Sequence, residues 1–173
     1  MEFFETVKSR YSYRKKLDPS TPSDEDLRKI VQAGLDAPSG KNAQTTGFII
    51  IRDPETVSKI NAMPGGSTAM STAPAFIAAH VSCAPEKIFL DYDFEIEDCA
   101  AAVAYILLAA ADLGYASVWV DGWLRTDNRA ADISRMCGLG HDRVVRIIIP
   151  IGRPLEKHPR CEKMSFDERV RII

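Results

Sequence analysis

The sequence predicts one domain in which strands alternate with helices, a fold of the α/β or α+β class with helices on both faces of a sheet. Short apolar runs bounded by turn residues recur along the chain, and Val144–Ile151 is the strongest of these strand candidates. Helix signals fall between them, with apolar residues at helical spacing behind good N-cap residues. The 173 residues carry no internal repeat, low-complexity tract or linker, and this length suits one hydrophobic core.

The first 62 residues are expected to form three helices and one strand. Residues 2–8 place two phenylalanines and a valine on one face, which predicts a short helix. Ser23 is a good N-cap for a second helix, whose apolar residues recur at helical spacing. The apolar run Phe48–Ile51 predicts a buried strand, and the pair Asp53-Pro54 combines a cap with a proline at the first position of a third helix.

The second half of the chain contains an unusually long predicted helix. Its apolar stretch Cys99–Ala111 has 13 residues, fewer than the roughly 20 that span a bilayer, so we expect a helix buried on nearly every side. In so short a chain, part of this alanine-rich surface is expected to meet a second subunit. The expected elements are a small-residue loop over 63–73, a strand over 75–82, the helix over 91–113 closed by Gly114, a strand over 117–120, a helix from Asp127 to about Gly138, the strand over 144–151 and an irregular basic tail.

Composition and charge narrow the class of protein. The formal net charge of −2 gives no reason to expect binding to nucleic acid or to an anionic membrane. The N-terminal residues lack the order of charge and apolar run that marks a signal peptide. We expect a cytoplasmic protein with free thiols and neither disulfides nor a metal site, because no Cys-x-x-Cys pair or zinc spacing occurs among Cys83, Cys99, Cys137 and Cys161.

The basic segment Arg10-x-Ser12-x-Arg14 is the first candidate for ligand binding. If this segment is extended, its two guanidinium groups and the hydroxyl point the same way. Arginine offers planar, bidentate hydrogen bonds, which suit a phosphate or another anion. Taken alone, the segment fits a solvated basic strand edge better than an anion site.

Two further segments could approach a ligand through backbone groups. Ala37–Gln44 is a small polar loop at a helix end, which could contact a planar ligand or be an ordinary turn; its spacing excludes a P-loop. Trp119–Gly122 ends a predicted strand, a favoured ligand position in α/β folds, although a strand-to-turn transition with a core tryptophan is the better explanation of this segment taken alone. His80 is expected to be a satisfied core group, and the acidic residues at 91–98 chiefly complement the helix dipole.

The order of these segments is more informative than any one of them. Arg10-Tyr-Ser-Tyr-Arg14 is followed by Ala37-Pro-Ser-Gly-Lys-Asn-Ala-Gln44, by the alanine-rich helix opening at Glu97-Asp98, by Trp119-Val-Asp-Gly122 and by Ile149-Pro-Ile-Gly152. This series resembles the nitroreductase family of FMN-dependent NAD(P)H oxidoreductases, over almost the whole chain. The resemblance implies one domain over 1–173, of α+β class, with a mixed sheet sandwiched by helices. It also implies an intertwined homodimer with FMN at the subunit interface.

The resemblance assigns the FMN phosphate and one flavin edge to the basic segment. Arg10 and Ser12 would hold the phosphate, and Arg14 would face the pyrimidine edge of the flavin. Tyr11 belongs to the same site. In the tail, Arg160 and Lys163 are the candidates for completing the phosphate site.

The remaining contacts implied by the resemblance come from the two small loops and the long helix. Pro38, Ser39 and Gly40 would come from the other subunit and pack against the isoalloxazine, with support from Asn42 and Gln44. Asp98 would contact the ribityl chain. The strip Trp119, Val120, Asp121 and Gly122 would run along one flavin edge, with a backbone N–H near N5.

The activity implied is reduction of nitroaromatics, quinones or similar electron-poor acceptors by NAD(P)H, in a ping-pong hydride transfer through FMN. No catalytic triad is visible, which fits an enzyme whose cofactor performs the chemistry. Arg14 would stabilise negative charge on the reduced flavin, as preorganised donors do elsewhere. The alternatives are a flavin-binding or storage protein, a specialised flavin reductase or dehalogenase of the same fold, and a structural domain without cofactor.

Overall fold

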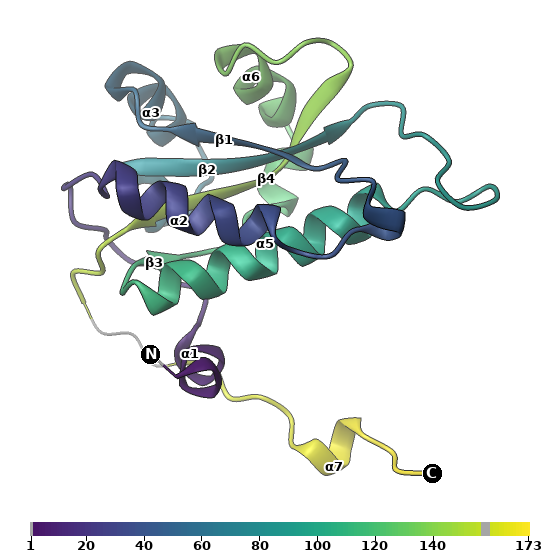
Figure 1. The fold of residues 1–173 in the computed structure, drawn as a ribbon. Coiled ribbons are helices and arrows are strands. Elements are labelled where there is room, and N and C mark those ends of the chain that lie inside the picture. Colours follow the sequence, from purple (N-terminus) through teal and green to yellow (C-terminus); the bar gives the residue numbers. More distant parts are fainter. Residues whose placement is uncertain (1, 157–159) are drawn as a thin grey trace.

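A four-stranded sheet lies between two layers of helices in the computed structural model, which describes residues 2–156 and 160–173 (Figure 1). The strands are β1 (Gly47–Ile51), β2 (Ala75–Ser82), β3 (Ala116–Ser117) and β4 (Arg143–Gly152), in the order β1-β2-β4-β3. All three neighbouring pairs are antiparallel. Beyond β3, Ser12 adds a parallel bridge to Ser117, so the sheet and its edge segment together contain both pairings.

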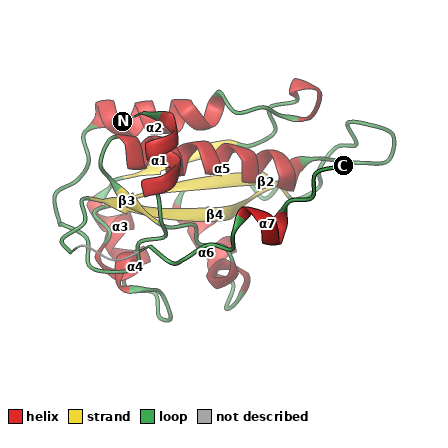
Figure 2. Ribbon diagram, turned by 90° about the horizontal axis from the view of Figure 1, so that it is seen from below, coloured by secondary structure: helices red, strands yellow, loops and turns green. Residues whose placement is uncertain are grey.

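The helices cover both faces of the sheet, as the sequence predicts (Figure 2). One layer holds α2 and α5, and the other holds α3, α4 and α6. The helix bounds are α1 (Phe3–Ser9), α2 (Asp24–Leu35), α3 (Pro54–Asn61), α4 (Thr68–Thr72), α5 (Glu95–Asp112), α6 (Arg129–Met136) and α7 (Phe166–Arg169), with short 3-10 turns at Gly40–Asn42 and Gly122–Arg125.

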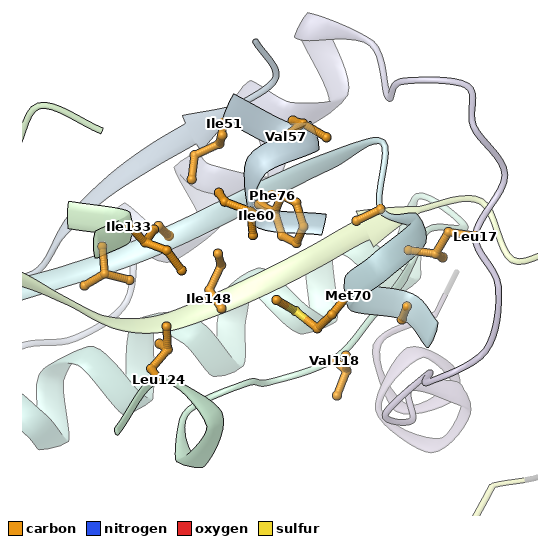
Figure 3. Close-up of a cluster of buried hydrophobic side chains, with 14 of the residues drawn as sticks. Leu17, Ile51, Val57, Ile60, Met70, Phe76, Val118, Leu124, Ile133 and Ile148 are labelled. Carbon is orange, nitrogen blue, oxygen red and sulfur yellow. The ribbon is translucent and has the colours of Figure 1, made fainter. Parts of the chain in front are cut away.

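Each face of the sheet has its own apolar core, because residues of β2 alternate between the two faces. Phe76 and Ala78 face the α3/α4/α6 layer, and Ile77 and Ala79 face the α2/α5 layer. Burial on both faces explains why this strand is a continuous apolar run. The first core, shown in Figure 3, includes Ile51, Val57, Ile60, Met70, Ile133 and Ile148, and the second includes Leu27, Ile30, Val103, Ile106, Ile147 and Ile149.

The capping signals and the central strands confirm the predictions from the sequence. The Ser23 hydroxyl accepts a hydrogen bond from the N–H of Asp26, and the Asp53 carboxylate accepts one from Thr56. The strand over 75–82 has the predicted bounds. His80 is a satisfied group, because its Nδ1 accepts a hydrogen bond of 2.6 Å from Nε of Arg143.

Five local predictions were wrong or only partly right. The tail, which was expected to be irregular, contains α7, and Ser165 caps it. The expected loop over 63–73 contains α4, which Ser67 caps, and the expected strand over 117–120 is reduced to β3 and a bridge at Val120. The long helix begins at Glu95, because residues 88–92 form a tight turn first. Asp127 does not cap α6: it has φ of 54° and pairs with Arg129, and Asn128 is the N-cap residue.

One side of α5 is open, although the sequence predicts burial on nearly every side. Its sheet-facing residues are buried, whereas Tyr105 is 44% exposed. Tyr105, Leu108 and Ala109 line a groove of about 420 Å³ together with Phe3 of α1 and Ala33 of α2. Within the described residues, no helix combines the length and the apolar character that a membrane span requires.

Candidate functional site

The basic segment at residues 10–14 is extended along the edge of the sheet. The N–H of Tyr13 donates to the carbonyl of Ser117 at 3.0 Å, next to the bridge at Ser12. The Tyr13 side chain is buried, and its hydroxyl donates to the carbonyl of Lys16 at 2.7 Å. Because side chains alternate along an extended chain, the burial of Tyr13 leaves Ser12 and Arg14 on the other side. The segment therefore has the extended conformation that an anion site at Arg10, Ser12 and Arg14 requires.

A small pocket of about 160 Å³ collects the residues predicted to bind a phosphate. The C-terminal tail returns to the basic segment, and the Arg160 guanidinium donates to the carbonyl of Lys8 at the end of α1. The structure therefore brings two segments together that are about 150 residues apart in the sequence. The described residues that line this pocket are Arg10, Tyr11, Ser12, Arg14, Arg160, Cys161 and Lys163.

The electrostatics of this pocket favour a negatively charged ligand. Burial, followed by the positive charge of Arg160, lowers the pKa of the Arg10 guanidinium. Neighbouring cations repel one another, and none of the described lining residues is acidic. An anion between these groups would relieve the repulsion and receive bidentate hydrogen bonds.

A second pocket, of about 210 Å³, adjoins the first at Arg14, which lines both. Its wall includes the predicted strip at residues 119–122 and the small loop Gly65-Gly66-Ser67. Met70, Val118 and Trp123 also line this second pocket, although no motif in the sequence marks them as site residues. Trp123 stands next to Gly122, and its indole N–H donates to the carbonyl of Pro64 at 3.0 Å, so it joins the two sides of the pocket.

The strip is hydrogen-bonded to β4, and the side chain of Asp121 within it forms ion pairs with two arginines. The backbone groups of Val120 and Ile148 exchange hydrogen bonds of 3.1 and 3.0 Å. The carboxylate of Asp121 accepts two bonds of 2.8 Å from Arg125 and another from Arg146. The hydrogen bond from Arg125, and then the charge of Arg146, lower the pKa of Asp121 against the effect of burial. Asp121 is therefore committed to ion pairs within the chain.

Gly122 leaves open space at the end of this strip. Apart from its own chain neighbours, no described residue lies within 4 Å of a Cβ placed on Gly122, and its φ is not in the left-handed region. Neither crowding nor backbone conformation requires glycine here. A ligand that approaches the backbone closely would require it.

The loop at residues 38–44 has a fixed and unusual shape. Lys41, Asn42 and Gln44 all have positive φ, between 48° and 58°. The N–H of Gln44 donates to the hydroxyl of Ser39 at 3.1 Å, and the N–H of Gly40 donates to Oδ1 of Asp98 at 2.8 Å. Such conformations cost free energy and are concentrated at functional sites.

This loop does not join the other predicted residues within one chain. Pro38, Ser39 and Gln44 line a separate pocket with Asp98, in the first turn of α5. Arg10 lines a pocket with Ala111, near the other end of α5. Ala111 lies thirteen residues after Asp98 along α5, a distance of about 20 Å at 1.5 Å per residue. The structure thus brings the basic segment, the tail and the strip together, and leaves the loop with Asp98 apart.

No group of histidine, cysteine, aspartate and glutamate side chains suited to a metal ion occurs among the described residues. Cys99 is buried, and burial raises the pKa of its thiol to about 11.

Comparisons with known proteins found similar sequences and similar solved structures. The model of the nitroreductase family matches residues 7–153. A protein of Archaeoglobus fulgidus named "Putative NADH dehydrogenase/NAD(P)H nitroreductase" is 37% identical over 136 residues, which are 78% of this chain and 76% of the relative. The solved FMN-dependent nitroreductase of Clostridium difficile R20291 is 28% identical, with a TM-score of 0.80 over 98% of both chains. The nitroreductase with bound FMN from Bacteroides fragilis has the same fold, with a TM-score of 0.80 at 22% identity over 100% of this chain and 99% of that one.

Proposed function

This chain belongs to the nitroreductase family, and from that premise we propose that it is an FMN-dependent oxidoreductase. In this proposal NAD(P)H is the electron donor, and the acceptor is a nitroaromatic, a quinone or a similar electron-poor compound. The observation that carries the proposal is that Arg14 lines both pockets. A cationic pocket for a phosphate and a second pocket for a ring system are thereby joined in the way that a mononucleotide needs.

The residues of the two pockets fit FMN. Arg10, Ser12, Arg160 and Lys163 would hold the phosphate, since they are its potential donors in the cationic pocket. The flavin ring would lie in the second pocket along Trp119–Gly122, where Gly122 leaves room for close approach. Asp121 would contribute backbone groups there, because its carboxylate is paired with two arginines.

A homodimer would complete this site. The loop at residues 38–44 is rigid and strained, yet it lies away from both pockets of its own chain. The open groove on α5 exposes Tyr105 and the apolar side chain of Phe3, which is 65% exposed. Apolar surface of this kind is typical of contacts between subunits. We propose that the loop of one subunit supplies Pro38, Ser39 and Gly40 to the flavin site of its partner.

The side chains of this protein would bind FMN and polarise its flavin ring, and the cofactor would supply the redox chemistry. When bound, FMN would supply the hydride-transfer chemistry between NAD(P)H and the acceptor, in a ping-pong cycle. Arg14 would then hold a fixed positive charge beside the flavin where negative charge develops, which preorganised donors do without reorganisation. Arg10 and Arg160 would neutralise the phosphate and so help to orient the ring.

The test is the visible absorption spectrum of the purified protein before and after anaerobic addition of NADH or NADPH. Flavin bands that bleach on addition of either nucleotide are the expected result. Bands that persist with both nucleotides would instead indicate a flavin carrier or another electron donor. A colourless protein that takes up no added FMN would refute the proposal.

A further inference from the structure

We propose that Arg146 is a positioning residue, which ties the strip at residues 119–122 to the sheet and so fixes the wall against which the flavin ring packs. This inference rests on the proposed function, because it assigns a role to a residue outside both pockets. Three observations support it: a β-bulge, the register of the strip, and the partners of Asp121.

The bulge places Arg146 outside the regular pattern of β4. Ala79 pairs with Ile147, but the next residue of β2, His80, pairs with Val145, so Arg146 has no partner in β2. The two apolar cores show the same shift, because Val145 and Ile148 belong to one and Ile147 to the other. A bulge redirects the side chain of its extra residue and recurs next to active sites.

The register places this extra residue beside the strip. Ser117 pairs with Ile151, and Val120 pairs with Ile148. In the same register, Arg146 falls opposite Gly122, at the point where the strip leaves the sheet for its 3-10 turn. The Arg146 guanidinium donates to Oδ1 of Asp121, and its side chain is only 20% exposed.

Arg125 binds the same carboxylate but cannot perform the same task. It lies four residues after Asp121 on the same short turn and moves with it, and its side chain is 58% exposed. Exposed pairs at this spacing contribute little to stability. Arg146 belongs to the central strand β4, so of the two arginines it is the one that joins the Asp121 carboxylate to the sheet. Arg125 therefore serves as a matched control for the loss of one cation from Asp121.

The experiment titrates the apoprotein with FMN and with riboflavin, which lacks the phosphate, and records the melting temperature of each apoprotein. Arg146→Met is expected to weaken binding of both ligands about tenfold, or about 1.4 kcal/mol, because both use the ring pocket. Arg125→Met should weaken the binding of FMN and riboflavin much less. Arg146→Lys, which keeps a donor for Asp121, should recover most of the affinity, and it remains informative if Arg146→Met does not fold. The double variant Asp121→Asn/Arg146→Met should lose little more FMN and riboflavin affinity than Asp121→Asn alone, because both substitutions remove the same contact.

Several results would overturn the inference. Unchanged FMN and riboflavin affinities in Arg146→Met would refute it, and so would a loss that Arg125→Met reproduces in full. A fall in melting temperature with unchanged affinities would assign Arg146 to general stability alone. Failure of the wild-type apoprotein to bind either ligand would refute the proposed function itself, and the positioning role with it.

Discussion

Asp98 accepts a hydrogen bond of 2.8 Å from the backbone N–H of Gly40, and this contact joins the first turn of α5 to the loop that follows α2. The carboxylate is buried, and its Oδ2 has no hydrogen-bond partner among the described residues. Gly40 is packed so closely that a Cβ there would lie 2.6 Å from the ring of Phe94. The loop is therefore fixed in shape before any second subunit contacts it.

Replacement of Asp98 should separate the role of its acceptor from the role of its charge. Asp98→Ala leaves the Gly40 N–H without its partner and should lower the free energy of unfolding by about 1–2 kcal/mol. Asp98→Asn keeps an acceptor and removes a buried charge, so its stability should stay close to that of the wild type. Urea unfolding of the three apoproteins at one protein concentration measures this. Equal losses in both variants would show that the charge, and not the hydrogen bond, fixes the loop.

Replacement of Arg10 should affect recognition of the phosphate alone. Arg10→Gln removes one cation from the pocket, so FMN affinity should fall about tenfold and depend less on salt, whereas riboflavin affinity should barely change. Lys15→Gln is the matched control, because it removes the same charge from an exposed residue that does not line this pocket. Equal losses for FMN and riboflavin in Arg10→Gln would place the phosphate elsewhere.

The sequence predicts those parts of the fold and site that depend on local chemistry. The caps Ser23 and Asp53 and the strand over 75–82 depend on residues that are neighbours in the chain, and the structure confirms them. The family order of the motifs predicts the sandwich of helices and sheet. The helix α4 was missed because four of its five residues are small; the Ser67 cap and the packing of Ala69 and Met70 in the core stabilise it.

The parts that the sequence could not predict depend on contacts between distant residues. The return of Arg160 to Lys8, and the bulge that presents Arg146 to Asp121, leave no local pattern in the chain. The family resemblance did identify Arg160, Lys163 and the strip as candidate site residues. Their assembly with the basic segment, and the separation of the loop at 38–44, emerge only from the fold.

Gly122 should be needed for the ligand and not for folding. Gly122→Ala places a methyl group where, apart from its own chain neighbours, no described residue lies within 4 Å, so the melting temperature of the apoprotein should be kept or slightly raised. FMN affinity should fall, because the methyl group occupies space beside the strip. Gly114→Ala is the contrast: Gly114 has φ of +76°, so this variant should lose about 1–2 kcal/mol of stability. Unchanged FMN affinity in Gly122→Ala would mean that the ring does not approach this position.

Arg14 should matter more for reduction of the flavin than for its binding. Arg14→Ala removes a positive charge from the junction of the two pockets, so anaerobic stopped-flow reduction by NADH should slow at least about tenfold. The FMN dissociation constant should rise by a smaller factor, because Arg10, Arg160 and Lys163 remain in the phosphate pocket. This role would be contradicted if Arg14→Ala lost most of its affinity for FMN but, once reconstituted with FMN, was reduced at the wild-type rate.

Cys161 provides a chemical probe of the phosphate pocket that requires no mutation. It lines this pocket, and both it and Cys83 are exposed. Alkylation requires the thiolate, so at pH 8 iodoacetamide should modify both residues, whereas Cys99, with its pKa raised to about 11 by burial, should react only in urea. Saturating FMN should slow modification of Cys161 at least about tenfold and leave Cys83 unchanged, as followed by peptide mass spectrometry. Riboflavin should protect Cys161 less than FMN does, because it lacks the phosphate. If Cys161 reacts at one rate with and without FMN, the tail does not close the phosphate site, and Arg160 and Lys163 lose their proposed role with it.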